Sequence, residues 1–443
     1  MNKTNSIALC ATIATAVAAH SAVPVVTPVS MTQADNRVVT ITYTLSDAPA
    51  VITLDVQTNA NTSAAANDPG WTSIGGEAIW NAEGDVWKEV AAGSRTITWR
   101  PDHSWPDHVI ENGGARAVVT AWALENTPDY MVVDLAAANT VRYYPGVDYL
   151  PKSGFDQPGA AVTNNPAYKT TKLLMRKIMA SGIEWTMGSA DGETQRNANE
   201  TPHVATLANN YYIGVFEVTQ AQWANINPGS SATASNVGET RPMDNLCYNE
   251  IRNDPGTSHA SHAAYDWPND PHPSSFLGLL RAKTGLDFDL PSEAQWEFAA
   301  RSGNGSGHWN DGSAVLNTDA DANLGNLGCY NANTPGGTAV VGSYAPSAWG
   351  LYDMHGNVFE WCLDWYEDDI SGNGGSANID PSNSTKTLSG VTKTGEWDML
   401  RVFRGGAYGG AAKGCRAAYR GNNPEWFRQP TYGFRVICTA GLR

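Results

Sequence analysis

The sequence predicts two domains of different class: a mainly β N-terminal sandwich, followed by a loop-rich α+β domain. A chain of 443 residues is too long for one ordinary hydrophobic core, which stops growing at about 250–300 residues. Short stretches of alternating apolar and polar residues fill the first third of the chain, whereas strong helix starts occur only beyond residue 200. The composition, with 42% apolar residues, 16% charged residues and 43 glycines, suits loop-rich globular domains.

The N-terminus has the pattern of a secretory signal. Lys3 precedes an apolar run at 7–19, which contains the small-residue sequence Ala16-Val17-Ala18 that signal peptidase prefers. We therefore expect residues 1–21 to be a signal peptide that is removed, and the protein to be secreted or periplasmic. The alternative is a frayed N-terminal tail, because the positive charge is a single lysine.

Residues 22–135 are expected to form an antiparallel sandwich. Period-two stretches occur at 38–44, 51–56, 95–99 and 117–122. Turns rich in Gly, Pro, Asn and Asp separate them, and no helical period lies between them. This pattern favours an immunoglobulin-like or fibronectin-like module.

Residues 136–171 are rich in Pro, Gly, Asn and Tyr and lack clear periodicity. Such a composition indicates an interdomain linker packed along the surface. The second domain is then expected to occupy 172–443.

Two capping boxes and one glycine stop mark three helices in this domain. In a capping box, a Ser or Thr accepts from the backbone three residues on, and a Gln at that position reaches back to the cap. The two pairs are Thr219 with Gln222 and Ser292 with Gln295. Residues 275–283 should form a third helix, which Gly285 can end in the left-handed conformation.

Six segments of the second domain form a series of motifs: 185–189 (WTMGS), 212–219 (YIGVFEVT), 290–297 (LPSEAQWE), 350–361 (GLYDMHGNVFEW), 404–406 (RGG) and 433–435 (GFR). In order and spacing they resemble the successive signatures of the sulfatase-modifying-factor family, to which formylglycine-generating enzymes belong. The resemblance covers the whole second domain and none of the first. It implies a C-type-lectin-like fold that is poor in regular structure.

The family's founding activity converts a sulfatase cysteine to formylglycine, using two active-site cysteines that bind copper and activate oxygen. The resemblance places those cysteines a few residues after the RGG segment. Here residues 407–416 read AYGGAAKGCR, and the matching positions hold Ala or Gly. Because Cu(I) prefers thiolate or thioether ligands, the single Cys415 cannot supply the paired site. Copper and formylglycine-forming activity are therefore not expected.

The resemblance also implies a structural disulfide. In the family, a disulfide joins two strands at positions that correspond here to Ala417 and Val436. Cys415 lies two residues before the first and Cys438 two residues after the second. In an antiparallel pair these shifts keep the partners opposite each other, so a Cys415–Cys438 disulfide is expected. The remaining cysteines, Cys247, Cys329 and Cys362, are left without an assigned pairing.

The 353–360 segment is the best metal candidate. The family binds Ca²⁺ there through an Asn or Asp side chain, two backbone carbonyls and a Glu, which carry over to Asp353, Gly356, Val358 and Glu360. All four can give the hard oxygen donors that Ca²⁺ prefers. The alternative is an acidic turn whose side chains form hydrogen bonds only with its own backbone. The family's second Ca²⁺ loop should fall within 323–342, but the sequence departs from the pattern and indicates no ligands.

The family's ligand groove lies beside residues 404–426. The residues expected near it are Arg404, Tyr408, Arg416, Tyr419, Arg420, Asn423 and Trp426. Arginine and aromatic side chains suit an extended peptide, a protein segment or a sugar. The alternative for the arginines is that they only satisfy loop carbonyls.

These observations favour a binding or scaffold module over an enzyme. The rival class is an oxidoreductase that acts on protein cysteine or through Cys247 or Cys362. The net charge of −16 repels phosphate backbones and anionic headgroups, so nucleic acid and membrane surfaces are not expected partners.

Overall fold

The structure is a computed structural model that describes residues 23–136, 140–151, 165–193, 195–256, 269–316, 319–371 and 400–439, together with residues 162, 265, 378 and 379. The expected signal peptide at 1–21 lies outside the described residues. No helix in these ranges is both long enough and apolar enough to span a bilayer.

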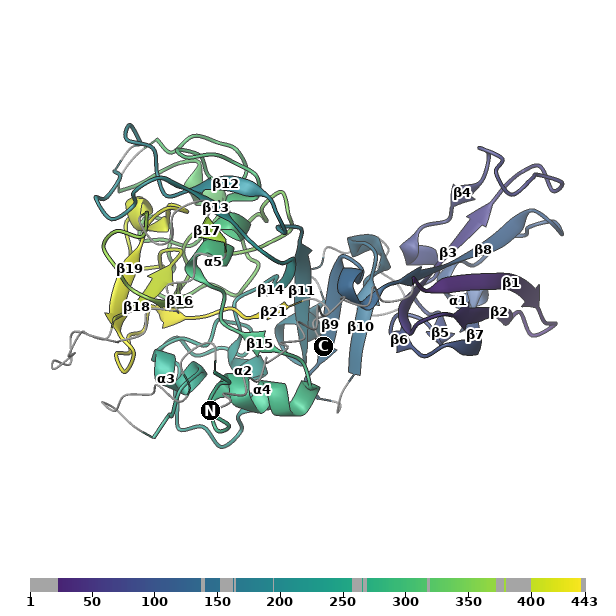
Figure 1. Ribbon diagram of the computed structural model, residues 1–443, viewed down its shortest axis with the longest axis horizontal. Helices are drawn as coiled ribbons and strands as arrows, with labels where there is room; N and C mark the ends of the chain where they lie inside the picture. Colours follow the sequence, from purple (N-terminus) through teal and green to yellow (C-terminus); the bar gives the residue numbers. More distant parts are fainter. Residues whose placement is uncertain are drawn as a thin grey trace, which may run out of the picture.

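The N-terminal part is built from two sheets that share one core (Figure 1). The first has the order β1-β2-β7-β5 and the second β4-β3-β6, with β8 also paired to β3. Their bounds are Val25–Gln33 (β1), Val39–Ser46 (β2), Ala50–Thr58 (β3), Thr72–Ser73 (β4), Glu83–Gly84 (β5), Glu89–Val90 (β6), Gly93–Trp99 (β7) and Ala115–Trp122 (β8); a short helix α1 spans Pro101–Ser104. All four stretches expected to be strands are strands. The immunoglobulin-like or fibronectin-like assignment stays a prediction.

Strand β2 shows why these residues form a sheet. Val39, Ile41, Tyr43 and Leu45 alternate with more exposed residues and are buried, because successive side chains of a strand point to opposite faces.

A six-stranded sheet joins the two parts of the chain and corrects the expected boundary at residue 135. Its order is β10-β9-β11-β14-β21-β15. The strands are Tyr130–Asp134 (β9), Thr140–Tyr144 (β10), Lys172–Ile178 (β11), Tyr211–Gly214 (β14), Phe288–Asp289 (β15) and Ile437–Thr439 (β21). Strands β9 and β10 therefore belong to the sheet of the second domain, not to a sandwich and a linker. The backbone pairing of β9 with β11 decides this.

The N-terminal sheets pack directly against this sheet (Figure 1). Trp87 stacks on Tyr144 at a centroid distance of 5.4 Å, and its carbonyl accepts from the Tyr143 N–H at 2.8 Å. One hydrophobic cluster runs from Ile41 and Ile52 to Val215 and Phe216. The two parts thus share a continuous core.

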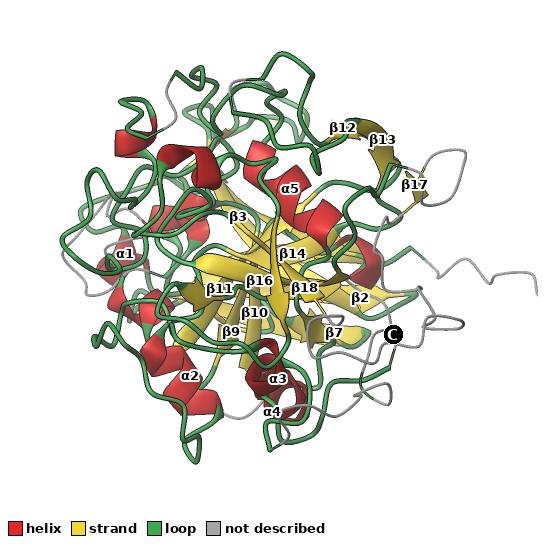
Figure 2. Ribbon diagram, turned by 90° about the vertical axis from the view of Figure 1, so that its left-hand side faces the viewer, coloured by secondary structure: helices red, strands yellow, loops and turns green. Residues whose placement is uncertain are grey.

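In the described part of the second domain, four α-helices lie around the strands (Figure 2). They are Gln220–Ile226 (α2), Tyr248–Ile251 (α3), Phe276–Thr284 (α4) and Glu293–Arg301 (α5). Both expected capping boxes are present, at Thr219 and Ser292, and α4 ends at Gly285 with φ of 69°. No sequence signal predicted α3.

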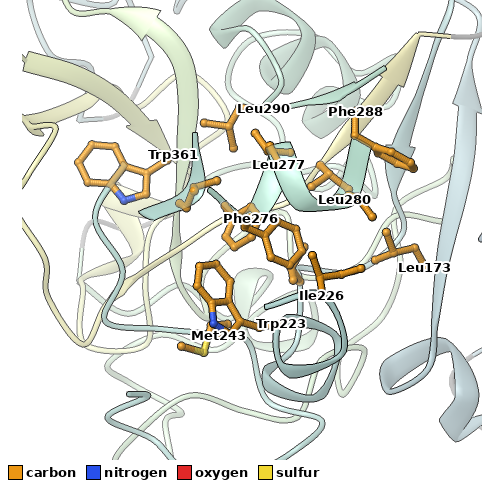
Figure 3. Packing of buried hydrophobic residues seen from close by; sticks show 14 of the residues in the cluster. Leu173, Trp223, Ile226, Met243, Phe276, Leu277, Leu280, Phe288, Leu290 and Trp361 are labelled. Carbon is orange, nitrogen blue, oxygen red and sulfur yellow. The ribbon is translucent and has the colours of Figure 1, made fainter. Parts of the chain in front are cut away.

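The largest core of this domain lies between α2, α4 and the strands (Figure 3). Trp223 of α2 stacks on Phe276 of α4 at 5.0 Å with an interplanar angle of 9°. Phe434 closes this group edge-on to both rings. The GFR segment is therefore anchored in the core, and Arg435 follows immediately.

Two further sheets lie among the described residues of the domain. One has the order β12-β13-β17 and the other β19-β18-β16-β20. Their strands are Glu184–Met187 (β12), His203–Thr206 (β13), Phe359–Trp365 (β16), Asn378–Ile379 (β17), Leu400–Arg404 (β18), Gly421–Pro424 (β19) and Tyr432–Gly433 (β20). The second of these sheets carries both candidate regions discussed next.

Candidate functional site

The 353–360 segment forms a tight loop that leads into β16. Asp353, Gly356 and Asn357 have positive φ angles of 57°, 103° and 63°. A side chain at Gly356 would meet the Cys329 carbonyl oxygen at 2.2 Å. The close approach of two backbone segments therefore requires glycine at this position.

Glu360 is a partner of an internal ion pair. Its side chain is fully buried, and Arg435 donates to its two carboxylate oxygens at 2.6 Å each. Trp296 Nε1 donates to the same carboxylate at 2.7 Å. Arg435 also donates to the carbonyls of Gly214 and Tyr352. Glu360 thus ties the loop to the GFR segment and to α5.

Asp353 has one satisfied and one unsatisfied carboxylate oxygen. Oδ2 accepts from the Gly342 N–H at 2.6 Å, whereas Oδ1 is buried without a hydrogen-bond partner. Burial raises the pKa of Asp353 to about 6. This carboxylate oxygen belongs to the expected calcium set and is available to a cation.

A third carboxylate, Glu217, belongs to the same cluster and was not predicted from the sequence. It is fully buried, accepts from Asn357 Nδ2 at 2.6 Å and from the Val358 N–H at 3.1 Å. Burial, followed by the charges of Asp353 and Glu360, raises the pKa of Glu217 well above its usual range. Its position two residues before the Thr219 cap gave no separate signal.

The cluster contains oxygen donors of the kind that Ca²⁺ prefers. Three buried carboxylates face the guanidinium of Arg435, with Lys169 also acting on Asp353. Across the described ranges, no three His, Cys, Asp or Glu side chains converge as a metal-binding group. An ion here would therefore need the backbone carbonyls of Gly356 and Val358 beside the carboxylates, as hard cations permit.

The three arginines expected at a ligand groove are internal supports, which corrects that expectation. Arg404, Arg416 and Arg420 are 0%, 1% and 4% exposed. Arg404 donates to the carbonyls of Ala418 and Tyr419 at 2.9 and 2.7 Å and pairs with Glu297.

The other two arginines bind glutamates from distant segments. Arg416 binds Glu193 and Glu200, and Arg420 binds Glu293 through two bonds of 2.5 and 2.9 Å. Their carboxylate partners hold these guanidiniums inside the domain, away from any surface ligand.

The remaining expected ligand residues are half-buried: Tyr408, Tyr419, Asn423 and Trp426. Tyr419 stacks with half-buried Phe359 at 6.3 Å, and Trp426 packs edge-on against Phe427 at 6.0 Å. Asn423 donates to the Tyr432 hydroxyl. Phe359, Phe427 and Asn423 contact Tyr432 of β20. We call the half-buried group of Tyr419, Asn423, Trp426, Phe359 and Phe427 the aromatic face.

The 407–416 segment, where the resemblance places the family's cysteine pair, contributes residues to a buried apolar cluster. Ala412 is fully buried in a cluster with Trp309, Leu324, Leu327, Tyr330 and Cys415. The Cys415 thiol lies against Gly406, where an added side chain would meet Sγ at 2.4 Å. Burial raises the pKa of Cys415 to about 12, so this thiol is protonated at neutral pH.

The expected Cys415–Cys438 disulfide is wrong for this structure. Both cysteines are free and buried. Cys438 lies on β21, opposite Tyr212 on one side and Phe288 on the other, while Cys415 ends the 3₁₀ turn Ala412–Cys415. The two residues are therefore not opposite each other on paired strands, which was the premise of the prediction.

The other three cysteines are also free and buried: Cys247, Cys329 and Cys362. Burial raises the pKa of Cys247 to about 12 and that of Cys362 well above its usual range. Neither has the lowered thiol pKa of a reactive cysteine.

Comparisons with known proteins agree with the motifs. The sulfatase-modifying factor enzyme 1-like domain matches residues 167–440. A protein named serine/threonine-protein kinase pkn1 from Chlamydia pneumoniae is 26% identical over 272 residues, which cover 60% of this chain and 38% of that protein. The formylglycine-generating enzyme of Thermomonospora curvata is 35% identical over 116 residues, covering 24% of this chain and 38% of the enzyme. The chain thus spans less than half the length of either relative.

Among solved structures, PvdO from Pseudomonas aeruginosa is similar to 60% of this chain. The match covers 94% of PvdO, with 23% sequence identity and a TM-score of 0.45.

Proposed function

The chain belongs to the sulfatase-modifying factor enzyme 1-like family, and on this premise we propose that its second domain is a binding or scaffold module without formylglycine-forming oxidase activity. One observation carries the proposal. The 407–416 segment, where the resemblance places the family's paired cysteines, holds a single cysteine, Cys415, which is buried in an apolar cluster with Ala412. Paired soft ligands for copper are missing there.

A peptide or a carbohydrate is the ligand class that the aromatic face suits best. Its half-buried aromatic rings offer flat apolar surface, and Asn423 adds a polar amide at the same place. Aromatic residues of this kind contribute much of the affinity at recognition surfaces. The buried arginines support the loops behind this face and are not part of the proposed contact.

The binding surface is tested with Tyr419→Ala and Trp426→Ala. The full chain is screened on a peptide library and a glycan array, and the strongest probe is then titrated against the variants. We expect each substitution to cost about 2 kcal/mol, a loss of about 30-fold in affinity. Trp71→Ala is the matched control, since Trp71 is also half-buried but lies in the N-terminal part.

Unchanged affinity in both face variants would contradict the assignment of this surface. A chain that binds no probe in either screen would contradict the ligand class itself.

Calcium is proposed as the cofactor of the 353–360 loop. Asp353 and Glu360 would hold the ion with the carbonyls of Gly356 and Val358, and the partnerless Oδ1 of Asp353 supports this. When bound, the ion would neutralise part of the carboxylate charge and stabilise the loop.

The proposal extends to location and to the N-terminal part. We infer a secreted or periplasmic protein from the signal-like sequence at 1–21, with an immunoglobulin-like or fibronectin-like N-terminal module. Nucleic acid and membranes are not proposed as partners, because of the net charge of −16.

The competing function is an oxidoreductase that uses protein cysteine chemistry. It would need an accessible thiolate, and burial raises the pKa of the Cys247 and Cys415 thiols to about 12. The thiol environments therefore favour the binding module.

A further inference from the structure

We infer that Glu217 is a positioning residue for the calcium loop, holding the two carbonyl ligands and Asp353 in their binding arrangement. The inference rests on the calcium site proposed above. Glu217 lies between β14 and α2, outside the loop itself, and both of its carboxylate oxygens are bound to loop atoms.

Backbone hydrogen bonds fix the directions of the proposed carbonyl ligands. In a trans peptide, the N–H and C=O groups point to opposite sides. The Asn357 N–H binds the Cys329 carbonyl at 2.7 Å, so the Gly356 carbonyl points away from Cys329. The Phe359 N–H binds the Thr431 carbonyl at 2.8 Å, which directs the Val358 carbonyl away from that segment.

Glu217 holds the peptide that lies between these two. The Val358 N–H donates to Glu217 Oε1 at 3.1 Å, while the Asn357 carbonyl of the same peptide accepts from the Tyr408 N–H at 2.9 Å. The peptide group between Asn357 and Val358 is thus hydrogen-bonded at both its C=O and its N–H. Rotation of this peptide would turn one or both neighbouring carbonyls, so Glu217 controls their mutual orientation.

The second oxygen of Glu217 reaches Asp353 through a chain of bonds. Asn357 Nδ2 donates to Glu217 Oε2 at 2.6 Å, and Asn357 Oδ1 accepts from the Ala339 N–H at 2.8 Å. The segment that follows Ala339 ends at Gly342, whose N–H binds Asp353 Oδ2 at 2.6 Å. Asp353 Oδ1 is left without a partner at the end of this chain.

The hydrogen-bond partners of the buried Glu217 carboxylate favour a cation bound nearby. The donors that bind it, an amide side chain and a backbone N–H, are neutral. The Arg435 guanidinium acts on Glu217 electrostatically, but its hydrogen bonds go to Glu360 and to the carbonyls of Gly214 and Tyr352. A buried carboxylate with only neutral donors is costly, and a divalent ion in the adjoining loop would offset that cost.

The test is calorimetric titration of the full chain with Ca²⁺ after removal of bound metal. Glutamine has the shape of Glu217 but only one acceptor oxygen, so Glu217→Gln cannot accept both bonds. We expect the Ca²⁺ dissociation constant to rise about 10- to 100-fold, as for other residues that orient metal ligands. Glu250→Gln is the matched control, because Glu250 is also buried and accepts a backbone N–H, from Cys247 at 3.0 Å, but belongs to α3.

Asn357→Gly is the second variant, and it carries the test if Glu217→Gln does not fold. Glycine tolerates the φ of 63° and removes one of the two bonds to Glu217, so the dissociation constant should again rise. A folded variant that binds Ca²⁺ with wild-type affinity would overturn the inference. So would a variant whose free energy of unfolding falls by the same amount with and without Ca²⁺. A wild-type chain that binds no Ca²⁺ would instead overturn the calcium site on which the inference rests.

Discussion

Replacing Arg435 by methionine is expected to lower the free energy of unfolding by about 3–5 kcal/mol. The guanidinium is fully buried and holds both oxygens of Glu360 at 2.6 Å. Methionine keeps much of the volume but leaves Glu360 charged beside Asp353 and Glu217. Removing one partner of a buried pair in this way leaves an uncompensated charge. Urea unfolding of the two proteins measures the difference.

Two further variants test whether the loss of stability comes from the uncompensated charge of Glu360. Arg428→Met removes an arginine whose side chain is 49% exposed and lies 3.3 Å from Glu250, and should cost less than about 1 kcal/mol. Adding Glu360→Gln to Arg435→Met should recover part of the lost stability, because it removes the uncompensated carboxylate. If Arg435→Met costs no more than Arg428→Met, the cluster does not hold the loop as described.

Chelation of calcium is the second change with a large expected effect. A ligand that binds only the folded state stabilises it by about 2.7 kcal/mol when its free concentration is a hundred times the dissociation constant. Removing the ion would leave Asp353, Glu217 and Glu360 to repel one another inside the protein. Thermal melts with and without chelator should therefore differ, with the lower melting temperature in chelator.

The Asp353→Gly variant distinguishes an effect of calcium binding on the melting temperature from an effect on the fold itself. Glycine accepts the φ of 57° at this position without strain, and it removes the carboxylate whose Oδ1 has no partner. The variant should lose the response to calcium and melt in chelator no lower than the wild type does. If the wild-type melts with and without chelator superimpose, the loop is an acidic turn that needs no ion.

Local signals explain what the sequence predicted correctly about the fold. The capping boxes at Thr219 and Ser292 join residues three apart, and the period of two in β2 depends only on neighbouring residues. Such patterns act within one element, so they can be recognised without knowing the partner segments. Strand β9 was assigned to the wrong domain because its pairing with β11 is a property of the folded chain.

Long-range pairs explain what the sequence did not predict about the site. Glu217 and Asn357 are 140 residues apart, and Glu360 and Arg435 are 75 apart. No spacing rule connects such residues. The disulfide prediction failed for a related reason, since it assumed a strand pairing for Cys438 that β14 and β15 occupy instead.

The central claim is that this domain keeps the family fold without its oxidase chemistry. The most direct measurement incubates the full chain with a cysteine-containing sulfatase-type peptide, copper and oxygen, beside an active formylglycine-generating enzyme, and follows the peptide by mass spectrometry. We predict an unmodified peptide cysteine and no stoichiometric Cu(I) on the protein, because the 407–416 segment holds a single buried cysteine, Cys415, instead of a thiolate pair. An aldehyde-bearing peptide formed at a catalytic rate would contradict the claim.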